Sequence, residues 1–73
     1  MPGYWPVRQR ALVNLKSGKG FRGVLWAKRG PLLILRDVTV RFEDGQTREL
    51  DGEIVIERTQ VEFIQLIPAE VSP

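Results

Sequence analysis

The stretch of residues 21–42, FRGVLWAKRGPLLILRDVTVRF, limits the folds open to this chain more than any other. It is typical of two strands joined by a tight turn at residues 28–31. The second strand begins with four consecutive apolar residues (32–35), as expected where both faces of a strand are covered. It then alternates apolar and polar residues up to Phe42. A strand that begins doubly buried and ends half exposed predicts a small, strongly bent sheet.

Three further strands are expected around this pair, over residues 10–16, 47–57 and 61–67. The first alternates in polarity, and glycine-containing turns at residues 17–20 and 43–46 mark hairpins. The strand 47–57 is interrupted at Asp51-Gly52. Gly23 inside a strand predicts a bend or a close backbone approach. We therefore expect an all-β protein, a five-stranded, strongly bent antiparallel barrel of the Sm-like or SH3-like type. Its parts are an extended arm (1–9), the barrel (10–68) and a tail (69–73).

Length and composition restrict the chain further. Seventy-three residues allow one domain of marginal stability. There is no Cys and no His, so neither a disulfide nor a thiolate or imidazole metal site can stabilise it. Association with copies of itself or with a larger protein is the remaining common source of stability. No apolar run is long enough for a membrane span or a signal peptide, which predicts a soluble cytoplasmic protein.

The charges are distributed unevenly along the chain. Residues 1–30 carry no acidic residue, whereas residues 31–73 carry all nine Asp and Glu. The basic half can be a nucleic-acid footprint, or it can meet the acidic half of a neighbouring copy. An ordinary mixed-charge surface explains the same pattern. The candidate nucleic-acid contacts are Lys16, Lys19, Arg22, Lys28 and Arg29.

The N-terminal arm carries two large aromatic side chains, Tyr4 and Trp5, between prolines. Proline fixes φ and removes a backbone donor, so the arm is expected to be extended. Tyr and Trp need a surface to cover. That surface is either the core of the same domain or a partner protein.

The sequence contains no catalytic constellation, and we expect no enzyme. Without His, a nucleophile has only carboxylates or Lys as its base. Ser17 and Lys19 are ordinary turn residues, and the acidic residues Asp37, Glu57 and Glu62 fit outward strand positions. Neither a metal site nor a cofactor site is predicted.

The order of strands and glycines resembles the Sm/Lsm-like family over residues 10–67. The first family motif corresponds to Leu15-Lys16-Ser17-Gly18, Gly23-Val24-Leu25 and Leu33-Ile34-Leu35-Arg36-Asp37. The second corresponds to Gly52-Glu53-Ile54-Val55-Ile56, Glu57-Arg58-Thr59-Gln60 and Val61-Glu62-Phe63-Ile64. The resemblance implies a small barrel that assembles into a ring.

The sequence differs from the family pattern at the residues that bind RNA. Family members that bind uridine-rich RNA use an Asp, an Asn and an Arg, and these positions fall here on Lys28, Leu32 and Glu57, with a turn one residue shorter. Leu32 cannot hydrogen-bond a base edge, and the carboxylate of Glu57 faces phosphates unfavourably. The base-reading pocket is therefore expected to be absent.

In Sm-like rings the fourth strand of one copy pairs with the fifth strand of the next, which removes exposed strand edges. Here both strands are apolar on both faces, which a buried neighbour would explain. Membership of the chain's own core is the alternative explanation. The predicted subunit-interface residues are Ile54, Ile56, Phe63, Ile64 and Leu66.

A second resemblance is to small proteins encoded among the capsid genes of actinobacterial tailed phages. It is carried by Tyr4 to Pro6, Gly23 to Trp26, Arg29 to Leu35 and Asp51 to Arg58. It implies a structural role in a virus particle.

Three functions follow as hypotheses. The first is a non-enzymatic assembly module, a minor structural or decoration protein of a phage virion whose arm contacts the shell protein. The alternative is a homo-oligomeric Sm-like ring that binds RNA through its basic surface. The third is an SH3-like adaptor that uses Trp26 as an aromatic platform for peptides.

Overall fold

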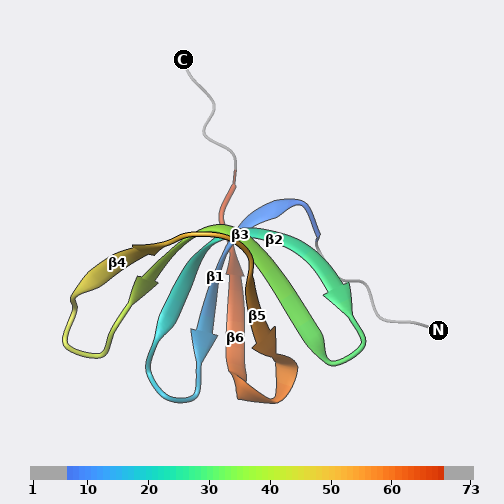
Figure 1. Ribbon diagram of the computed structural model, residues 1–73. Coiled ribbons are helices and arrows are strands. Elements are labelled where there is room, and N and C mark those ends of the chain that lie inside the picture. The colour runs from blue at the N-terminus through green and yellow to red at the C-terminus, as the bar shows by residue number, and fades with distance from the viewer. Residues whose placement is uncertain (1–6, 69–73) are drawn as a thin grey trace.

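The computed structural model describes residues 7–68, and within this range the chain is built from short strands and one turn of 3-10 helix. Figure 1 shows the strands fanning out below a common crest. The elements are β1 (Gln9–Leu15), β2 (Gly20–Arg29), β3 (Leu32–Arg41), β4 (Thr47–Leu50), β5 (Ile54–Glu57), η1 (Arg58–Gln60) and β6 (Val61–Leu66). The all-β prediction is confirmed, and the expected interruption divides the fourth strand into β4 and β5.

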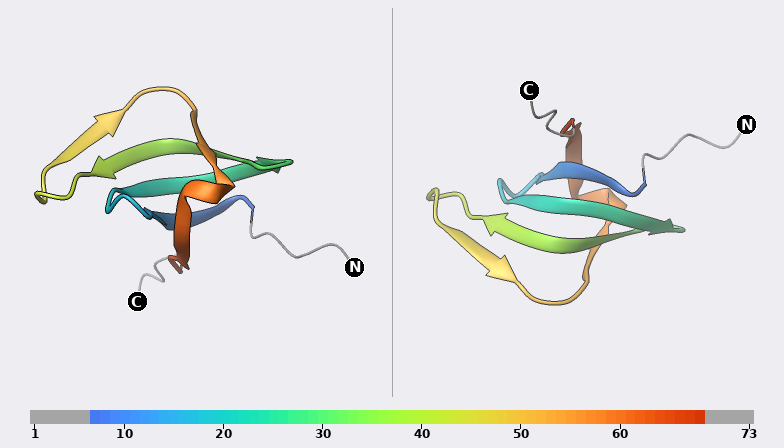
Figure 2. Two further views of the ribbon diagram at one scale, coloured as in Figure 1. Left: turned by 90° about the horizontal axis from the view of Figure 1, so that it is seen from below. Right: turned by 90° about the horizontal axis from the view of Figure 1, so that it is seen from above.

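All strands belong to one antiparallel sheet in the order β4-β3-β2-β1-β6, with β5 also paired to β3. The second half of β3 pairs with β4 and its first half pairs with β5. The chain can change direction between them because Gly52 adopts φ 79°, which other residues rarely adopt. Seen from below and from above, β4 and β6 lie at opposite sides of the sheet, and the chain after β4 arches across through β5 to η1 and β6 (Figure 2).

The bend of the sheet has an identifiable cause in β2. The register between β2 and β3 shifts twice, between Arg22 and Val24 and between Leu25 and Ala27. Such bulges kink a strand and increase its twist. A Cβ atom at Gly23 would lie 2.7 Å from the carbonyl oxygen of Arg36, so only glycine fits there. The predicted close backbone approach at Gly23 is confirmed.

The core lies on the concave face of the bent sheet. Its buried apolar residues are Ala11, Val13, Leu25, Leu33, Leu35, Val38, Val40 and Ile56. The alternation expected of β1 and of the second half of β3 is confirmed. The expectation that β3 begins doubly buried is wrong, since Leu32 is 36% exposed and Ile34 only half-buried. The outer face of β3 has no layer above it among residues 7–68.

None of the helical structure in residues 7–68 has the length and apolar character of a membrane-crossing helix.

Candidate nucleic-acid interface

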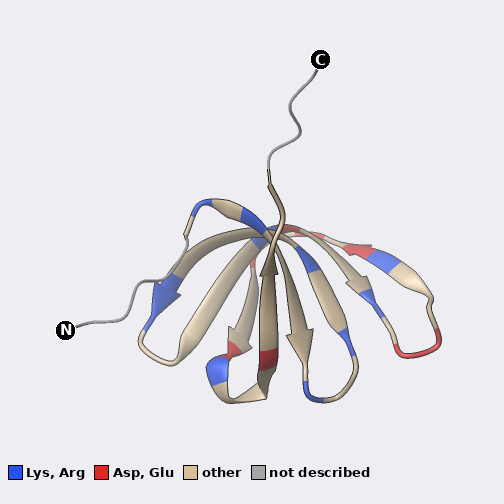
Figure 3. Ribbon diagram, turned by 180° about the vertical axis from the view of Figure 1, so that it is seen from behind, with Lys and Arg blue, Asp and Glu red and all other residues tan. Residues whose placement is uncertain are grey.

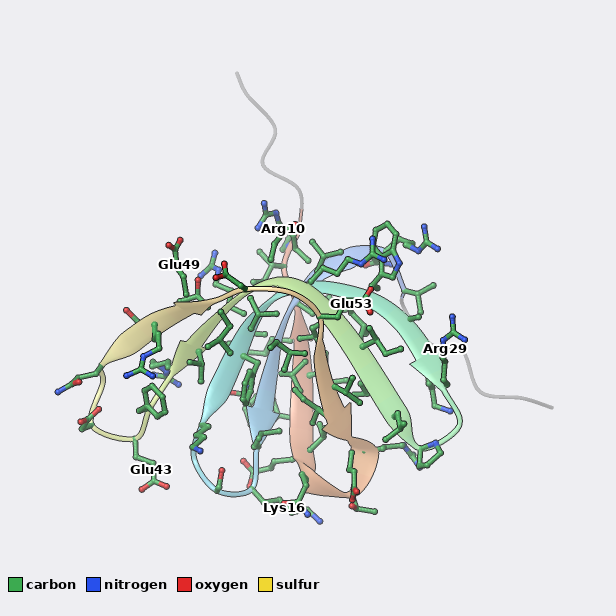
Figure 4. The ribbon with its side chains drawn as sticks, in the orientation of Figure 1. Arg10, Lys16, Arg29, Glu43, Glu49 and Glu53 are labelled. Carbon is green, nitrogen blue, oxygen red and sulfur yellow. The ribbon has the colours of Figure 1, made fainter. Side chains whose placement is uncertain are left out.

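Three loops meet at the end of the sheet opposite the crest. The backbone N–H of Arg58 in η1 donates a 2.7 Å hydrogen bond to the carbonyl oxygen of Pro31 in the β2–β3 turn. The N–H of Lys16 donates a 2.9 Å bond to the carbonyl oxygen of Gln60. Figure 4 shows Lys16 at this lower end, beside η1. These bonds hold the β1–β2, β2–β3 and β5–β6 connections together as one surface.

An open hollow of about 640 Å³ lies between these loops and the start of β6. Three cationic side chains line it against one carboxylate, that of Glu62, so the hollow is suited to an anion. Its lining residues are Lys16, Lys28, Gly30, Pro31, Arg58, Thr59, Val61, Glu62, Phe63 and Ile64. We call it the loop hollow.

Two of the five predicted nucleic-acid contacts lie at this hollow. Lys16 and Lys28 line the loop hollow. Arg58 was not among the predicted contacts, although it follows Glu57 directly, one position after the arginine of the family motif. Arg58 reaches the hollow because its backbone is hydrogen-bonded to Pro31, and not because of its position in the sequence motif.

The other predicted cations lie elsewhere. Lys19 sits 5.6 Å from the centre of the Phe42 ring. Arg22 lies opposite Leu12 and Thr39, on the outer face of the sheet. Arg29 is exposed at the end of β2 and is not part of the lining (Figure 4).

The positions that carry base recognition in the family do come together. Leu32 and Glu57 are direct partners in the β3–β5 ladder, and Lys28 lines the neighbouring hollow. Their side chains are an exposed leucine, a carboxylate and a lysine. No amide or guanidinium group stands at these positions to hydrogen-bond a base edge or clamp its face.

Two strand edges lack a hydrogen-bonding strand partner within residues 7–68: the outer edge of β4–β5 and that of β6. Both carry exposed apolar side chains, Val55 at 56%, Phe63 at 49% and Leu66 at 47%. Of the other predicted interface residues, Ile54 and Ile64 pack against the core and Ile56 belongs to it, only 6% exposed. Val55 was missed, and alternation along β5 explains why it points outward when Ile56 points in.

Trp26 is not the open platform that an SH3-like adaptor needs. The guanidinium carbons of Arg8 and Arg36 lie 3.8 Å and 4.0 Å from its ring centre. The indole is therefore already occupied by two guanidinium groups of the same chain. Tyr4 and Trp5, the predicted contacts of the arm, lie outside the described residues.

The charge asymmetry of the sequence persists in space. Figure 3 shows acidic residues along the β3–β4 loop, β4 and the link to β5, and basic residues on β1 and β2. Near η1 both signs occur. Across residues 7–68, no group of three or more Asp and Glu side chains is placed to hold a metal ion.

No family model and no curated protein matches the sequence, but solved structures do. A heptameric archaeal Sm protein is 27% identical, with a TM-score of 0.72 over 85% of this chain and 90% of the other. The Sm heptamer of P. aerophilum is 26% identical, with a TM-score of 0.73 over 86% and 84%. The Sm protein of Pyrococcus abyssii, solved in complex with a uridine heptamer, is 31% identical, with a TM-score of 0.71 over 84% and 86%.

These three neighbours bear on both resemblances seen in the sequence. None of them is described as a phage or capsid protein, so they lend no support to the virion hypothesis or to a shell-protein partner. They support the Sm resemblance in fold, strand order and extent. At this identity and coverage, the chain belongs to the Sm family of small, bent β-sheet proteins.

Proposed function

We propose that this chain forms a homo-oligomeric ring and that the ring is a non-enzymatic binder of single-stranded RNA. Copies join by pairing the β4–β5 edge of one with the β6 edge of the next. RNA is held at the loop hollow by its phosphates, without selection of the base. This proposal retains the non-enzymatic assembly module of the first hypothesis, but its partner is RNA rather than the shell protein of a phage.

The two unpaired strand edges carry this proposal. An exposed edge is a template for pairing with another chain, and proteins cover it or blunt it with charge. Here the edges instead carry Val55, Phe63 and Leu66, each about half exposed or more. An edge at each side of one sheet makes a head-to-tail contact, which closes into a ring when the rotation allows. Two of the structural neighbours are heptamers.

The loop hollow supports the RNA part of the proposal. Lys16, Lys28 and Arg58 line it, and a ring would repeat these three cations once per copy. A neighbour of the same fold was solved with a uridine heptamer. Because Leu32 and Glu57 replace the base-reading residues, the binding expected here is electrostatic and tolerant of sequence.

Two measurements test the proposal. Light scattering should give a mass several times that of the 8.3 kDa chain. Anisotropy of labelled single-stranded RNA should show binding that weakens with salt and is similar for oligouridine and oligoadenosine. The double substitution Lys28→Gln with Arg58→Gln removes two phosphate contacts and should lower the affinity by about tenfold or more. The slope of log affinity against log salt concentration should become shallower by about 0.7 for each lost contact.

A matched control removes the same charge elsewhere. Lys19 and Arg48 lie 5.6 Å and 6.0 Å from the Phe42 ring and outside the loop hollow. Lys19→Gln with Arg48→Gln should therefore bind RNA more tightly than the loop variant does. A monomeric parent would contradict the ring, and equal affinities of the two double variants would contradict the RNA site.

A further inference from the structure

The outer, convex face of the sheet carries a second basic surface, apart from the loop hollow. Directly opposite residues of antiparallel strands point to the same face of the sheet. Arg10 of β1, Val24 of β2 and Arg36 of β3 lie opposite one another in one such row. In the next row, Leu12 of β1 lies opposite Arg22 of β2. Figure 4 shows Arg10 at the crest, pointing away from the hollow of the sheet and far from Lys16.

Trp26 fixes two arginines on this face. Besides stacking on the indole, Arg8 donates from Nε to the carbonyl oxygen of Trp26 at 3.1 Å, and its backbone N–H donates to Leu25 at 2.6 Å. Arg36 donates from Nε and Nη2 to Oε2 of Glu53, at 2.8 Å and 2.7 Å. A guanidinium carries five N–H donors in its plane, so each arginine keeps further donors for a ligand besides those bonded to Trp26 or Glu53, and the face turned away from the indole is not used by the stacking contact.

The charge of this face favours a polyanion. Four arginines surround Trp26 and Val24, and Glu53 is the carboxylate paired among them. The arginines are Arg8, Arg10, Arg22 and Arg36, all of them exposed. Two are pre-positioned, so less side-chain freedom is lost when they bind. We call this set the arginine–tryptophan cluster.

We propose that the arginine–tryptophan cluster is a second binding site for single-stranded RNA, on the outer face of each copy. Phosphates lie against Arg10 and Arg22, and an unpaired base stacks on the open face of the Arg8 or Arg36 guanidinium. This rests on the proposed function only in the class of ligand, because the two sites share no residue.

The planar guanidinium groups of Arg8 and Arg36 favour RNA over an acidic peptide as the ligand. Arginine planes stack on unpaired bases, and single-stranded nucleic acid presents a base beside every phosphate. An acidic peptide uses the positive charge but does not present an aromatic ring beside each negative charge to stack on the guanidinium faces. Val24, half-buried between Arg10 and Arg36, adds apolar surface in the same row. The cluster therefore matches a ligand that alternates charge with flat rings.

Trp26 provides a reporter for this site alone. The chain has two tryptophans, so Trp5→Phe leaves Trp26 as the one indole. In this background, with the loop hollow disabled by Lys28→Gln and Arg58→Gln, adding oligouridine or oligoadenosine at low salt should still change the Trp26 emission. Arg10→Gln with Arg22→Gln, which leaves the stacked arginines in place, should weaken that response about tenfold and lower the salt slope by about 1.4. Arg10→Lys with Arg22→Lys should restore most of the binding.

Each outcome separates this site from the loop hollow. An unchanged Trp26 emission, with binding abolished by the loop substitutions, overturns the second site and leaves the proposed function standing. Binding that survives the loop substitutions and weakens when Arg10→Gln and Arg22→Gln are added to them supports the second site. If Arg10→Gln with Arg22→Gln abolishes all binding while the loop hollow is intact, the RNA site at the loop hollow is contradicted. Polyglutamate that changes the emission where RNA does not assigns the cluster to acidic peptides and overturns the inference.

Discussion

Leu32 and Glu57 lie directly opposite each other in the β3–β5 ladder. The hydrogen bond from the Arg58 N–H to Pro31, at 2.7 Å, fixes the turns beside them. The two sequence motifs of the family thus meet at one place. What stands there is a methyl-bearing side chain and a carboxylate, so the frame of a base-binding site is kept while its hydrogen-bonding groups are missing.

Restoring those groups should restore base selection. We expect Leu32→Asn with Glu57→Arg to favour oligouridine over oligoadenosine by roughly fivefold, since one net hydrogen bond is worth about 1 kcal/mol. The parent should bind both alike. Competition binding with the two labelled oligonucleotides measures the ratio. Glu57→Arg alone should tighten both ligands without changing their ratio, and a double variant with no preference would show that the shortened turn displaces the site.

Charges placed on the strand edges should prevent assembly. Val55→Lys and Phe63→Lys each put an ammonium group on an edge strand where burial would desolvate it. We expect either variant to scatter light as a monomer with an unchanged far-ultraviolet spectrum. Val7→Lys is the matched control, since Val7 is 40% exposed and outside both edge strands. An assembled mass in both edge variants would refute the edge-to-edge contact.

A methyl group at position 23 should destabilise the fold. In Gly23→Ala the new Cβ meets two backbone oxygens, of Arg36 at 2.7 Å and of Asp37 at 3.1 Å, which cannot move without distorting β3. We expect the free energy of unfolding to fall by about 1–3 kcal/mol, measured by urea denaturation in a monomeric edge variant. Gly20→Ala is the control, because its Cβ meets the flexible end of Leu12 at 3.3 Å and should cost less.

Two adjacent leucines should respond very differently to truncation. Leu33 is fully buried and Leu32 is 36% exposed. Leu33→Ala should lower the free energy of unfolding by about 2–5 kcal/mol, because it removes buried methyl groups and leaves a cavity. Leu32→Ala should change it by about 0.5 kcal/mol or less in the monomeric background. Equal losses would mean that both faces of β3 are covered, as its apolar sequence suggests.

The sequence by itself determined the strands and their turns. Period-two alternation marks which side of β1 and β3 faces the core, because successive side chains of a strand point to opposite faces. Glycine at 23 and 52 marks a close approach and a change of direction, because a Cβ atom does not fit at position 23 and residues other than glycine rarely adopt the φ angle found at position 52. These are local properties of the backbone, and they suffice for the fold class and the family.

Only the tertiary structure decided which apolar and charged residues are available to a partner. Ile56 enters the core and Val55 points out, although the segment is apolar throughout. Arg58 reaches the loop hollow through a bond to the β2–β3 turn, and Arg8 and Arg36 converge on Trp26 from different strands. Exposure and charge clustering depend on which strands the bent sheet brings together, and that is set by contacts between residues far apart in the chain.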